Sequence, residues 1–299
     1  SGRGPGYSHI ARERVSRREV YQHYDIDGIE LDYIMVSPPH AIFDRMVATG
    51  EFHVSEMSGA LYLAQRGRGT FPFVAIPVFP SRVFRHGNIF VNRRAGIATP
   101  KDLEGKTFAT AIWGVVTTYA RGMLKKFHGV DHTTFKWIAN VDGPWPLHKP
   151  VNVEYRTDKK PQWQRLLDGE VDACSGDIID PKAWEIMEAS PHIVKRLFPN
   201  YRQMHRDLRR DHGIVTPTHM MAMGGKLHRE NPGLSRKLYD AFERSREIAI
   251  ADAQGDGSSY NLIMDARELM RDQLKEMGDI YKHGIAANRD LFEMTLDFY

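Results

Sequence analysis

The sequence predicts an α/β protein of two lobes with a ligand cleft between them, and three patterns lead to this prediction. Between residues 28 and 79, strand-like apolar runs alternate with helix-like segments, the order of an open α/β sheet whose ligand lies beyond the carboxyl ends of its strands. The pattern changes over at Arg93–Gly96. Beyond it, TPKDLEGK (Thr99–Lys106) precedes a strand, and LLDGEVDA (Leu166–Ala173) follows further along.

The first lobe begins with alternating apolar residues, which predict a strand. Helical spacing of Ile42, Phe43, Met46 and Val47 then predicts a helix ending at Gly50, and Ser58 is placed to cap the next helix. The expected elements are a strand at Gly28–Val36, a short strand before Ser58, a helix at Gly59–Arg66, and strands at Phe73–Phe79 and Asn88–Asn92.

The second lobe repeats the alternation, and a strand then leads into a helical carboxy-terminal region. Residues 140–161 are predicted to be irregular, and RDLRR (Arg206–Arg210) is predicted to be a solvated helix face. The expected elements are strands at Lys106–Ala111, Phe135–Ile138 and Ile214–Met223, helices at Val116–Phe127 and Gln162–Leu167, and helices through Pro232–Tyr299. We therefore assign residues 1–93 with 212–299 to one lobe and residues 94–211 to the other.

Composition limits the function classes. A net charge of +3 is too small to indicate nucleic-acid binding, and a single cysteine, Cys174, excludes a disulfide framework and a cysteine-cluster metal site. No apolar run has the length of a membrane span or a signal sequence, so we expect no membrane partner and favour the cytoplasm. The apolar carboxy-terminal helices could pack on a second copy of the chain, although packing on their own sheet is favoured.

The run FVAIPVFPSRVFRHGNIFVN (Phe73–Asn92) carries the main candidate for ligand binding. Arg82, Arg85 and His86 follow a buried strand, and guanidinium forks match carboxylates bidentately. A solvated basic loop is the alternative. Thr117 and Thr118 lie in the first turn of a predicted helix, where backbone amides favour an anion; they could equally be capping residues.

Several runs together resemble one known family. They are IFDRMVATGEFHVSEMS, FVAIPVFPSRVFRHGNIFVN, LLDGEVDA, VKRLFPNYR and HGIAANRDLFEMTLDF. The order of elements resembles the type II periplasmic-binding-protein fold, and these runs resemble the 4,5-dihydroxyphthalate decarboxylase family within it. The resemblance implies a two-lobe α/β protein that removes carbon dioxide from a hydroxylated aromatic diacid without an organic cofactor. It also implies an anion-handling role for Arg82, Arg85 and His86, which match the family's motif.

Decarboxylation of such an acid needs a clamp for the retained carboxylate and a proton donor. We expect Arg82, Arg85 and Ser81 to bind the carboxylate, with Thr117 and Thr118 completing the clamp from the other lobe. His86 and His219 are the candidate general acids, although His219 could instead satisfy backbone groups. Glu56 could orient a substrate hydroxyl or pair with an arginine, and Trp113 could stack on an aromatic ligand or serve packing.

Three questions stay open from the sequence. A divalent metal could be held by Asp177 and Asp180 together with His86 or His219. A non-catalytic solute-binding protein for an anionic aromatic ligand would suit the same architecture. The junction ATAIWGVVT replaces the family's usual GVPEYQ, which fits a divergent decarboxylase for another aromatic or heteroaromatic acid.

Overall fold

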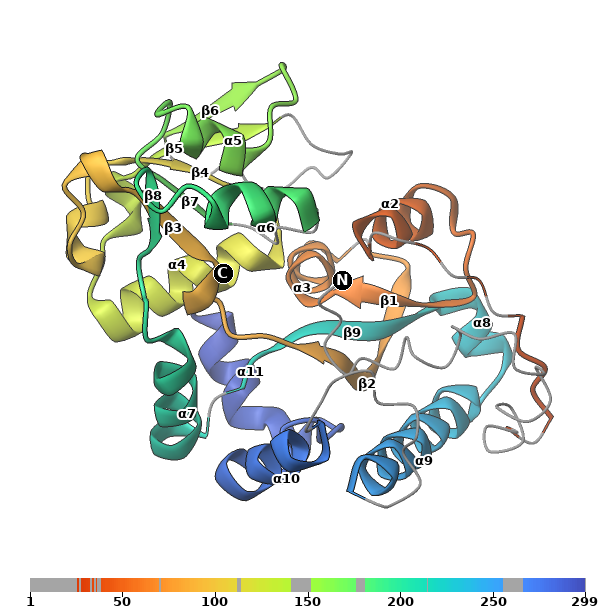
Figure 1. The fold of residues 1–299 in the computed structure, drawn as a ribbon. Helices are drawn as coiled ribbons and strands as arrows, with labels where there is room; N and C mark the ends of the chain where they lie inside the picture. Colours follow the sequence, from red (N-terminus) through yellow and green to blue (C-terminus); the bar gives the residue numbers. More distant parts are fainter. Residues whose placement is uncertain are drawn as a thin grey trace.

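Two β-sheets form the framework of the molecule (Figure 1). This computed structural model describes residues 26, 28–32, 34, 36, 39–69, 71–111, 114–140, 152–175, 181–213, 215–254 and 266–298. Within these residues the smaller sheet has the order β1-β9-β2 and the larger has the order β6-β5-β4-β7-β3-β8. The strands are β1 (Val54–Ser58), β2 (Phe73–Arg82), β3 (Ile89–Asn92), β4 (Thr107–Ala109), β5 (Lys136–Asn140), β6 (Val153–Arg156), β7 (Ala173–Ser175), β8 (Val194–Arg196) and β9 (Pro217–Gly224).

Helices cover both sheets. They are α2 (Pro39–Thr49), α3 (Gly59–Gly67), α4 (Val115–His128), α5 (Gln162–Leu167), α6 (Pro181–Glu188), α7 (Tyr201–His212), α8 (Gly225–Glu230), α9 (Leu234–Gln254), α10 (Ala266–Met277) and α11 (Arg289–Leu296), with short 3₁₀ turns such as η2 (His86–Asn88) between them. In the larger sheet Ile89 and Val91 pack with residues of α4, whereas Phe90 packs with residues of α5 and α6. Burial on both faces explains the continuous apolar runs of these strands.

The smaller sheet is antiparallel about β9. Both β1 and β2 pair with β9, and the register sets Ser58 and Ser81 opposite His219. On one face Phe43 and Met46 of α2 and Leu61 of α3 pack against the sheet, and on the other Leu238 of α9 does so. The carboxyl ends of β1 and β2 and the amino end of β9 therefore lie at the same end of this sheet.

The chain passes between the sheets twice. It leaves the smaller sheet after Arg82 and enters the larger at Ile89; it returns from Arg196 through α7 to Pro217. Within the larger sheet β3 is antiparallel to β7, with Ile89 opposite Ser175, so β3 begins where β7 ends. The two sheets joined by these crossings form the predicted two-lobe, type II periplasmic-binding-protein-like fold, which Figure 1 shows with α3 and α4 between the sheets.

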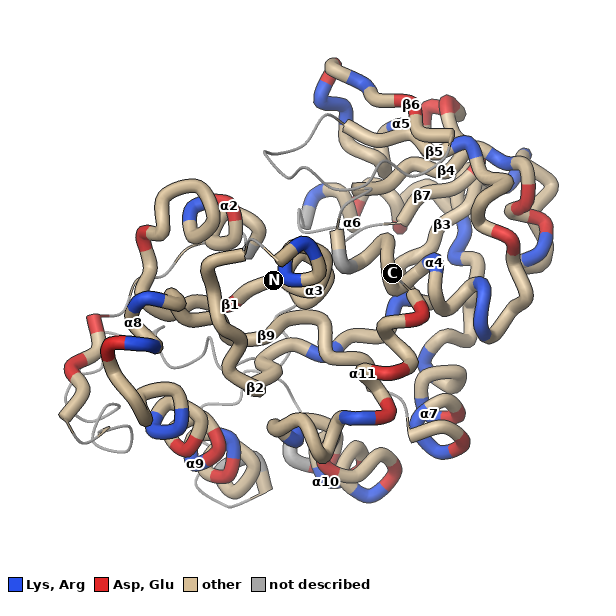
Figure 2. Tube along the Cα trace, turned by 180° about the vertical axis from the view of Figure 1, so that it is seen from behind, with Lys and Arg blue, Asp and Glu red and all other residues tan. Residues whose placement is uncertain are grey.

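Most predicted elements are confirmed. The helix ending before Gly50, the Ser58 cap of α3, the helix Gln162–Leu167 and the strand before Gly225 appear as expected. The predicted solvated face on α7 is also confirmed, since Arg206 and Arg210 are 52% and 64% exposed and both ion-pair with carboxylates. Figure 2 shows both signs of charge on α7.

Two predicted segments are wrong. The described residues of Gly28–Val36 form no strand beyond a single bridge between Ile26 and Ile29. Leu31 and Ile34 of this segment are about half exposed, so its apolar side chains are not buried against a sheet despite their alternating pattern. Conversely, the irregular region 140–161 contains the edge strand β6, which pairs with β5 and alternates half-buried with exposed side chains.

The assignment of residues 1–93 with 212–299 and of 94–211 to separate lobes stays a prediction. The strand pairing adds one detail. Because β3 pairs with β7 and β8 of the larger sheet, the chain changes from the smaller sheet to the larger one between Arg82 and Ile89. No helix among the described residues is long and apolar enough to cross a bilayer.

Candidate functional site

A paired histidine and glutamate lie at the edge of the smaller sheet where both crossings attach. His219 Nδ1 is 2.6 Å from Glu56 Oε1, and the two side chains are 15% and 28% exposed. Glu56 pairs with Met221, which is two residues from His219 on β9. The side chains of Glu56 and His219 are therefore diagonal neighbours on one face of the sheet. Phe43 of α2 packs edge-on against the imidazole at 5.1 Å. A carboxylate that accepts from Nδ1–H orients the ring and leaves Nε2 to exchange a proton.

This pair answers two questions that the sequence left open. Among the described residues, the hydrogen-bonded partner of Glu56 is His219. His219 is held by a side chain rather than by backbone groups. The partners are 163 residues apart, so only the strand register brings them together.

Hydroxyl groups surround the same edge. Ser58 accepts from the Leu61 amide at 3.4 Å and so caps α3. Thr218 Oγ1 lies 2.9 Å from Ser81 Oγ, so the hydroxyl of Ser81 already contacts a neighbouring strand. Ser81 retains partial exposure, as expected for a ligand-binding residue, but its binding role stays a prediction.

The junction before α4 is a buried hydroxyl cluster. Thr117 Oγ1 donates to the Ala111 carbonyl at 2.7 Å and is hydrogen-bonded to Thr110 Oγ1, which lies 3.1 Å from Ser175 Oγ. Thr118 donates to the Gly114 carbonyl at 3.4 Å. Sequence reasoning did not single out Thr110 or Ser175. Both residues could have been found from the sequence, because each carries a hydroxyl and follows or ends a strand, where ligand sites form in α/β proteins.

Arg82 is engaged by the protein itself. It is 8% exposed and donates to the carbonyls of Val215 and Lys282 at 3.0 and 2.6 Å, and to Asn288 Oδ1 at 2.6 Å. Arg85 is 2% exposed. The clamp role of both arginines stays a prediction.

His86 is enclosed by other rings. It is 1% exposed, and its ring centroid lies 5.4 Å from His128, 5.6 Å from His205 and 5.0 Å from Phe198. Neither ring nitrogen has a hydrogen-bond partner among the described residues. Burial, together with the neighbouring His205 and His128, lowers the pKa of His86 to about 3. Its imidazole is therefore neutral near pH 7, whereas a proton donor must carry the proton.

Other predicted site residues lie outside the described residues: Trp113, Asp177 and Asp180. Among the described residues, no three histidine, cysteine, aspartate or glutamate side chains are arranged to hold a metal ion. The metal prediction therefore stays untested. Burial raises the pKa of the Cys174 thiol to about 12.

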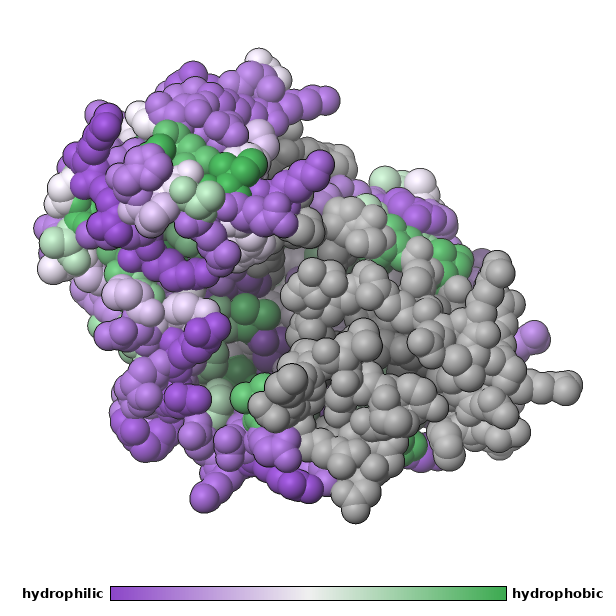
Figure 3. Space-filling model, in the orientation of Figure 1, coloured by the Kyte–Doolittle hydropathy of each residue, from purple (hydrophilic) through white to green (hydrophobic). Residues whose placement is uncertain are grey.

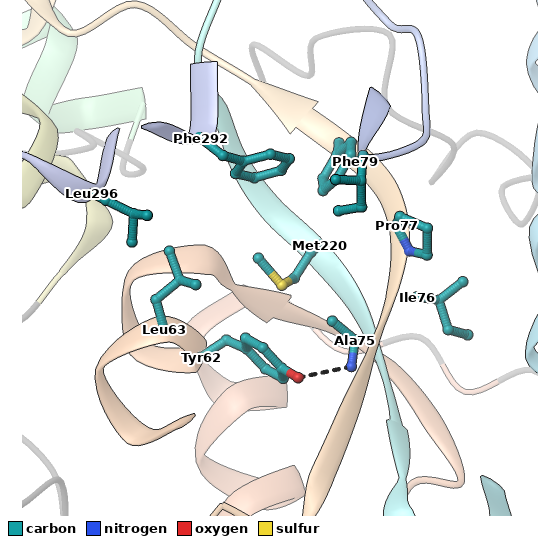
Figure 4. Close-up of a pocket in the computed structure, with 10 residues that line it drawn as sticks. Tyr62, Leu63, Ala75, Ile76, Pro77, Phe79, Met220, Phe292 and Leu296 are labelled. Carbon is teal, nitrogen blue, oxygen red and sulfur yellow. Dashed lines mark hydrogen bonds between the residues drawn. The ribbon is translucent and has the colours of Figure 1, made fainter. Parts of the chain in front are cut away.

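An apolar pocket of about 300 Å³ lies beside β2 and α3 of the smaller sheet, and neither Glu56 nor His219 lines it (Figure 4). Met220, adjacent to His219 in β9, points into it, as alternation along a strand requires. The hydroxyl of Tyr62 accepts from the Ala75 amide at 2.9 Å. This pocket therefore offers apolar contact and does not belong to the Glu56–His219 site.

Comparison with known proteins identifies relatives. Residues 22–143 match the family described as NMT1/THI5 like. A 4,5-dihydroxyphthalate decarboxylase of Comamonas testosteroni is 25% identical over 281 residues, which cover 91% of this chain and 84% of the relative. A 4,5-dihydroxyphthalate decarboxylase of Pseudomonas putida is 32% identical over 191 residues, which cover 61% of this chain and 69% of the relative.

Solved structures resemble the chain at lower identity. The alkanesulfonate-binding protein SsuA from Xanthomonas axonopodis pv. citri, bound to MOPS, is 12% identical with a TM-score of 0.49, covering 90% of this chain and 82% of that one. A putative periplasmic sulfonate-binding protein SsuA from Methylobacillus flagellatus KT is also 12% identical, with a TM-score of 0.47, covering 92% and 69%. The sequence relatives, rather than these structures, assign the family. The chain belongs to the 4,5-dihydroxyphthalate decarboxylase family.

Proposed function

We propose that this protein catalyses the non-oxidative decarboxylation of a hydroxylated aromatic carboxylic acid such as 4,5-dihydroxyphthalate, with His219 as proton donor and Glu56 as its positioning partner. The Glu56–His219 pair carries this proposal. It is partly exposed, and its 2.6 Å contact leaves one imidazole nitrogen for chemistry. The names of the two curated relatives support the reaction class.

The reaction replaces a carboxylate by a proton on the ring. His219 Nε2–H donates its proton to the ring carbon that bears the carboxylate, and a ring hydroxyl that loses its own proton becomes a carbonyl. The bond between the ring carbon and the carboxylate then breaks, its electron pair restores the aromatic ring, and carbon dioxide leaves. As carbon dioxide leaves, the ring carbonyl becomes a phenolate, which takes up one proton from water. The proton released earlier from the hydroxyl restores the imidazolium, so the sum is one acid anion plus one proton giving the arene and carbon dioxide.

Glu56 has a defined part in this sequence. Its carboxylate accepts from Nδ1–H, which stabilises the charged imidazolium and points Nε2 away from β1. A retained carboxylate on a diacid would need a separate cation, and this is the predicted role of Arg82 and Arg85.

The test is carbon dioxide release from a panel of hydroxylated aromatic mono- and diacids, with and without chelator. We expect His219→Asn to lower kcat by about 10²–10⁴-fold, the usual contribution of a general acid. Glu56→Gln should lower it less, because the imidazole remains. His86→Asn is the matched control and should retain most of the activity once its stability has been checked, since His86 lies among buried rings.

Three results would contradict the proposal. Normal turnover in His219→Asn would exclude this residue as the donor, and a selective loss in His86→Asn would transfer the role to His86. Tight binding of an acid with no gas released from any of them would identify a binding protein. The chelator arm tests the predicted metal independently of the histidine variants.

A further inference from the structure

A second pocket lies beside the first crossing between the sheets. It has a volume of about 300 Å³ and is lined by Gly87, Asn88, Trp184, Glu188, Arg196 and Tyr201. Asn88 directly precedes Ile89, which lies opposite Ser175 at the end of β7. The pocket thus adjoins the edge of the larger sheet that carries the buried hydroxyl cluster. On this face the surface is hollowed between α6 and α7 (Figure 3).

Arg196 is held in this pocket by three aromatic rings. Its Cζ lies 4.8 Å from the ring centre of Phe90, 4.9 Å from that of Trp184 and 5.1 Å from that of Tyr201. Rings stacked on a guanidinium leave its edges for hydrogen bonds. Nη1 uses one edge by donating to the Gly87 carbonyl.

The other edge of this guanidinium has no acceptor among the described residues. Its Nε–H and one Nη2–H point the same way and form the fork that a carboxylate matches with its two oxygens. Arg196 is only partly buried, so this edge can meet a ligand from solvent. In this respect it differs from Arg82, which is buried and donates to three protein oxygens.

The charges around Arg196 also favour an anion. Arg202 stacks on the same Tyr201 ring, 5.3 Å from its centre. Partial burial lowers the pKa of Arg196, and Arg202 lowers it further, whereas Tyr201 and Glu188 act in the opposite direction. Two guanidiniums therefore share one ring, and the described structure shows no ion pair between Arg196 and Glu188. A bound carboxylate would relieve the repulsion between the two cations.

Close packing makes one wall of the pocket rigid. A Cβ at Gly87 would lie 2.7 Å from the Tyr201 ring, so only glycine allows this approach. The ring of Tyr201 therefore has a fixed place, and its remaining surface and the ring of Trp184 offer apolar contact to a flat ligand.

We propose that this pocket binds an aromatic carboxylate, whose two oxygens accept from Nε and Nη2 of Arg196 while its ring packs against Trp184 and Tyr201. The proposal goes beyond the reaction assigned to His219 and does not depend on it, because a carboxylate can bind here whether or not the Glu56–His219 pair transfers a proton.

The experiment follows the indole N–H resonance of Trp184 by NMR during titration with benzoate. The chain has five tryptophans, and the resonance absent from Trp184→Phe assigns the signal. We expect a saturable shift with benzoate, a much weaker response to acetate, which lacks the ring, and none to benzyl alcohol, which lacks the charge. No saturable shift with benzoate would overturn the proposal.

Three variants locate the bound acid. Arg196→Gln should weaken benzoate binding by about tenfold or more, the value of charged hydrogen bonds. Glu188→Gln should tighten it about two- to threefold by removing a nearby like charge, and this exposed change also tests the pocket if Arg196→Gln folds poorly. His219→Asn should leave binding unchanged. Unchanged affinity in Glu188→Gln and Arg196→Gln, or loss in His219→Asn, would place benzoate elsewhere and overturn the proposal.

Discussion

At the scale of single residues, surroundings decide what each histidine can do. His86 and His219 are both predicted as candidate proton donors, but their surroundings differ. His86 is enclosed by the rings of His128, His205 and Phe198, whereas His219 is partly exposed and hydrogen-bonded to Glu56. Burial lowers the pKa of His86 to about 3 and that of His205 to about 4, from an ordinary value of 6.5. These buried rings therefore affect stability more directly than chemistry.

The stability of the fold should fall as the solution becomes acidic. Below pH 6.5 the unfolded chain binds protons at His86 and His205, whereas the folded chain does not until about pH 3 to 4. Stability is then lost by about 1.4 kcal/mol per pH unit for each histidine. Urea unfolding at several pH values between 6.5 and 4.5 measures this slope.

His205→Phe should reduce that slope by the contribution of one histidine. Phe84 already stacks on this ring at 4.3 Å, so an aromatic replacement keeps the contact. His192→Gln, at an exposed position, is the control and should leave the slope unchanged. An identical slope in His205→Phe and in the unaltered protein would show that the buried histidines do not cause the acid sensitivity.

At the scale of elements, the contact between α4 and the end of the chain depends on one glycine. A Cβ at Gly122 would lie 2.0 Å from the ring of Phe298, which packs edge-on against Tyr119 with ring centres 6.0 Å apart. Phe298 also packs with Ala60, Val116 and Met123, so this ring fastens the carboxy-terminal segment to α3 and α4.

Gly122→Ala should destabilise the protein by about 1–3 kcal/mol, although alanine is the better helix former, because the added methyl group displaces Phe298. Denaturant unfolding measures the loss. Gly67→Ala is the matched control: nothing lies within 4 Å of that added methyl group, so it should be neutral or slightly stabilising. In a Phe298→Ala background the cost of Gly122→Ala should disappear; a persistent cost would place the clash elsewhere.

At the scale of the whole molecule, Arg82 joins parts of the chain that are far apart in sequence. It stands at the end of β2, where the chain leaves the smaller sheet, and binds Val215 just before β9 returns. It also binds Lys282 and Asn288 near the carboxy terminus, and Asn288 Nδ2 donates to the Lys282 carbonyl at 3.0 Å. One guanidinium thus ties together the two crossings and the carboxy-terminal segment.

Arg82→Lys should lower the free energy of unfolding by about 2–4 kcal/mol, because an ammonium cannot serve three acceptors spread around a planar fork and leaves buried carbonyls unpaired. Thermal and denaturant unfolding measure this. Arg236→Lys, on the exposed face of α9 beside Asp240, is the control and should change stability by less than about 0.5 kcal/mol. An equally small loss of stability in both variants would show that the Arg82 hydrogen bonds do not stabilise the two crossings.

The sequence by itself determined the local features. Helical spacing before Gly50, Ser58 as a cap and the apolar run of β2 each depend on residues within a few positions, and each appears as predicted. The predictions that failed are those for which strand formation depends on pairing with a distant strand rather than on the local pattern. Leu31 and Ile34 lie in a strand-like sequence pattern, but they are about half exposed and the described residues around them pair with no sheet. In contrast, β6 forms because it pairs with β5.

The candidate site shows the same division. The sequence named Glu56 and His219 as separate candidates, and the motif at Arg82–His86 as the strongest one. Only the tertiary structure placed Glu56 against His219 across 163 residues, directed Arg82 at protein carbonyls, and set Arg196 among three rings. The physical reason is that residue type sets which interactions a side chain can make, whereas strand register and burial set which of them it does make.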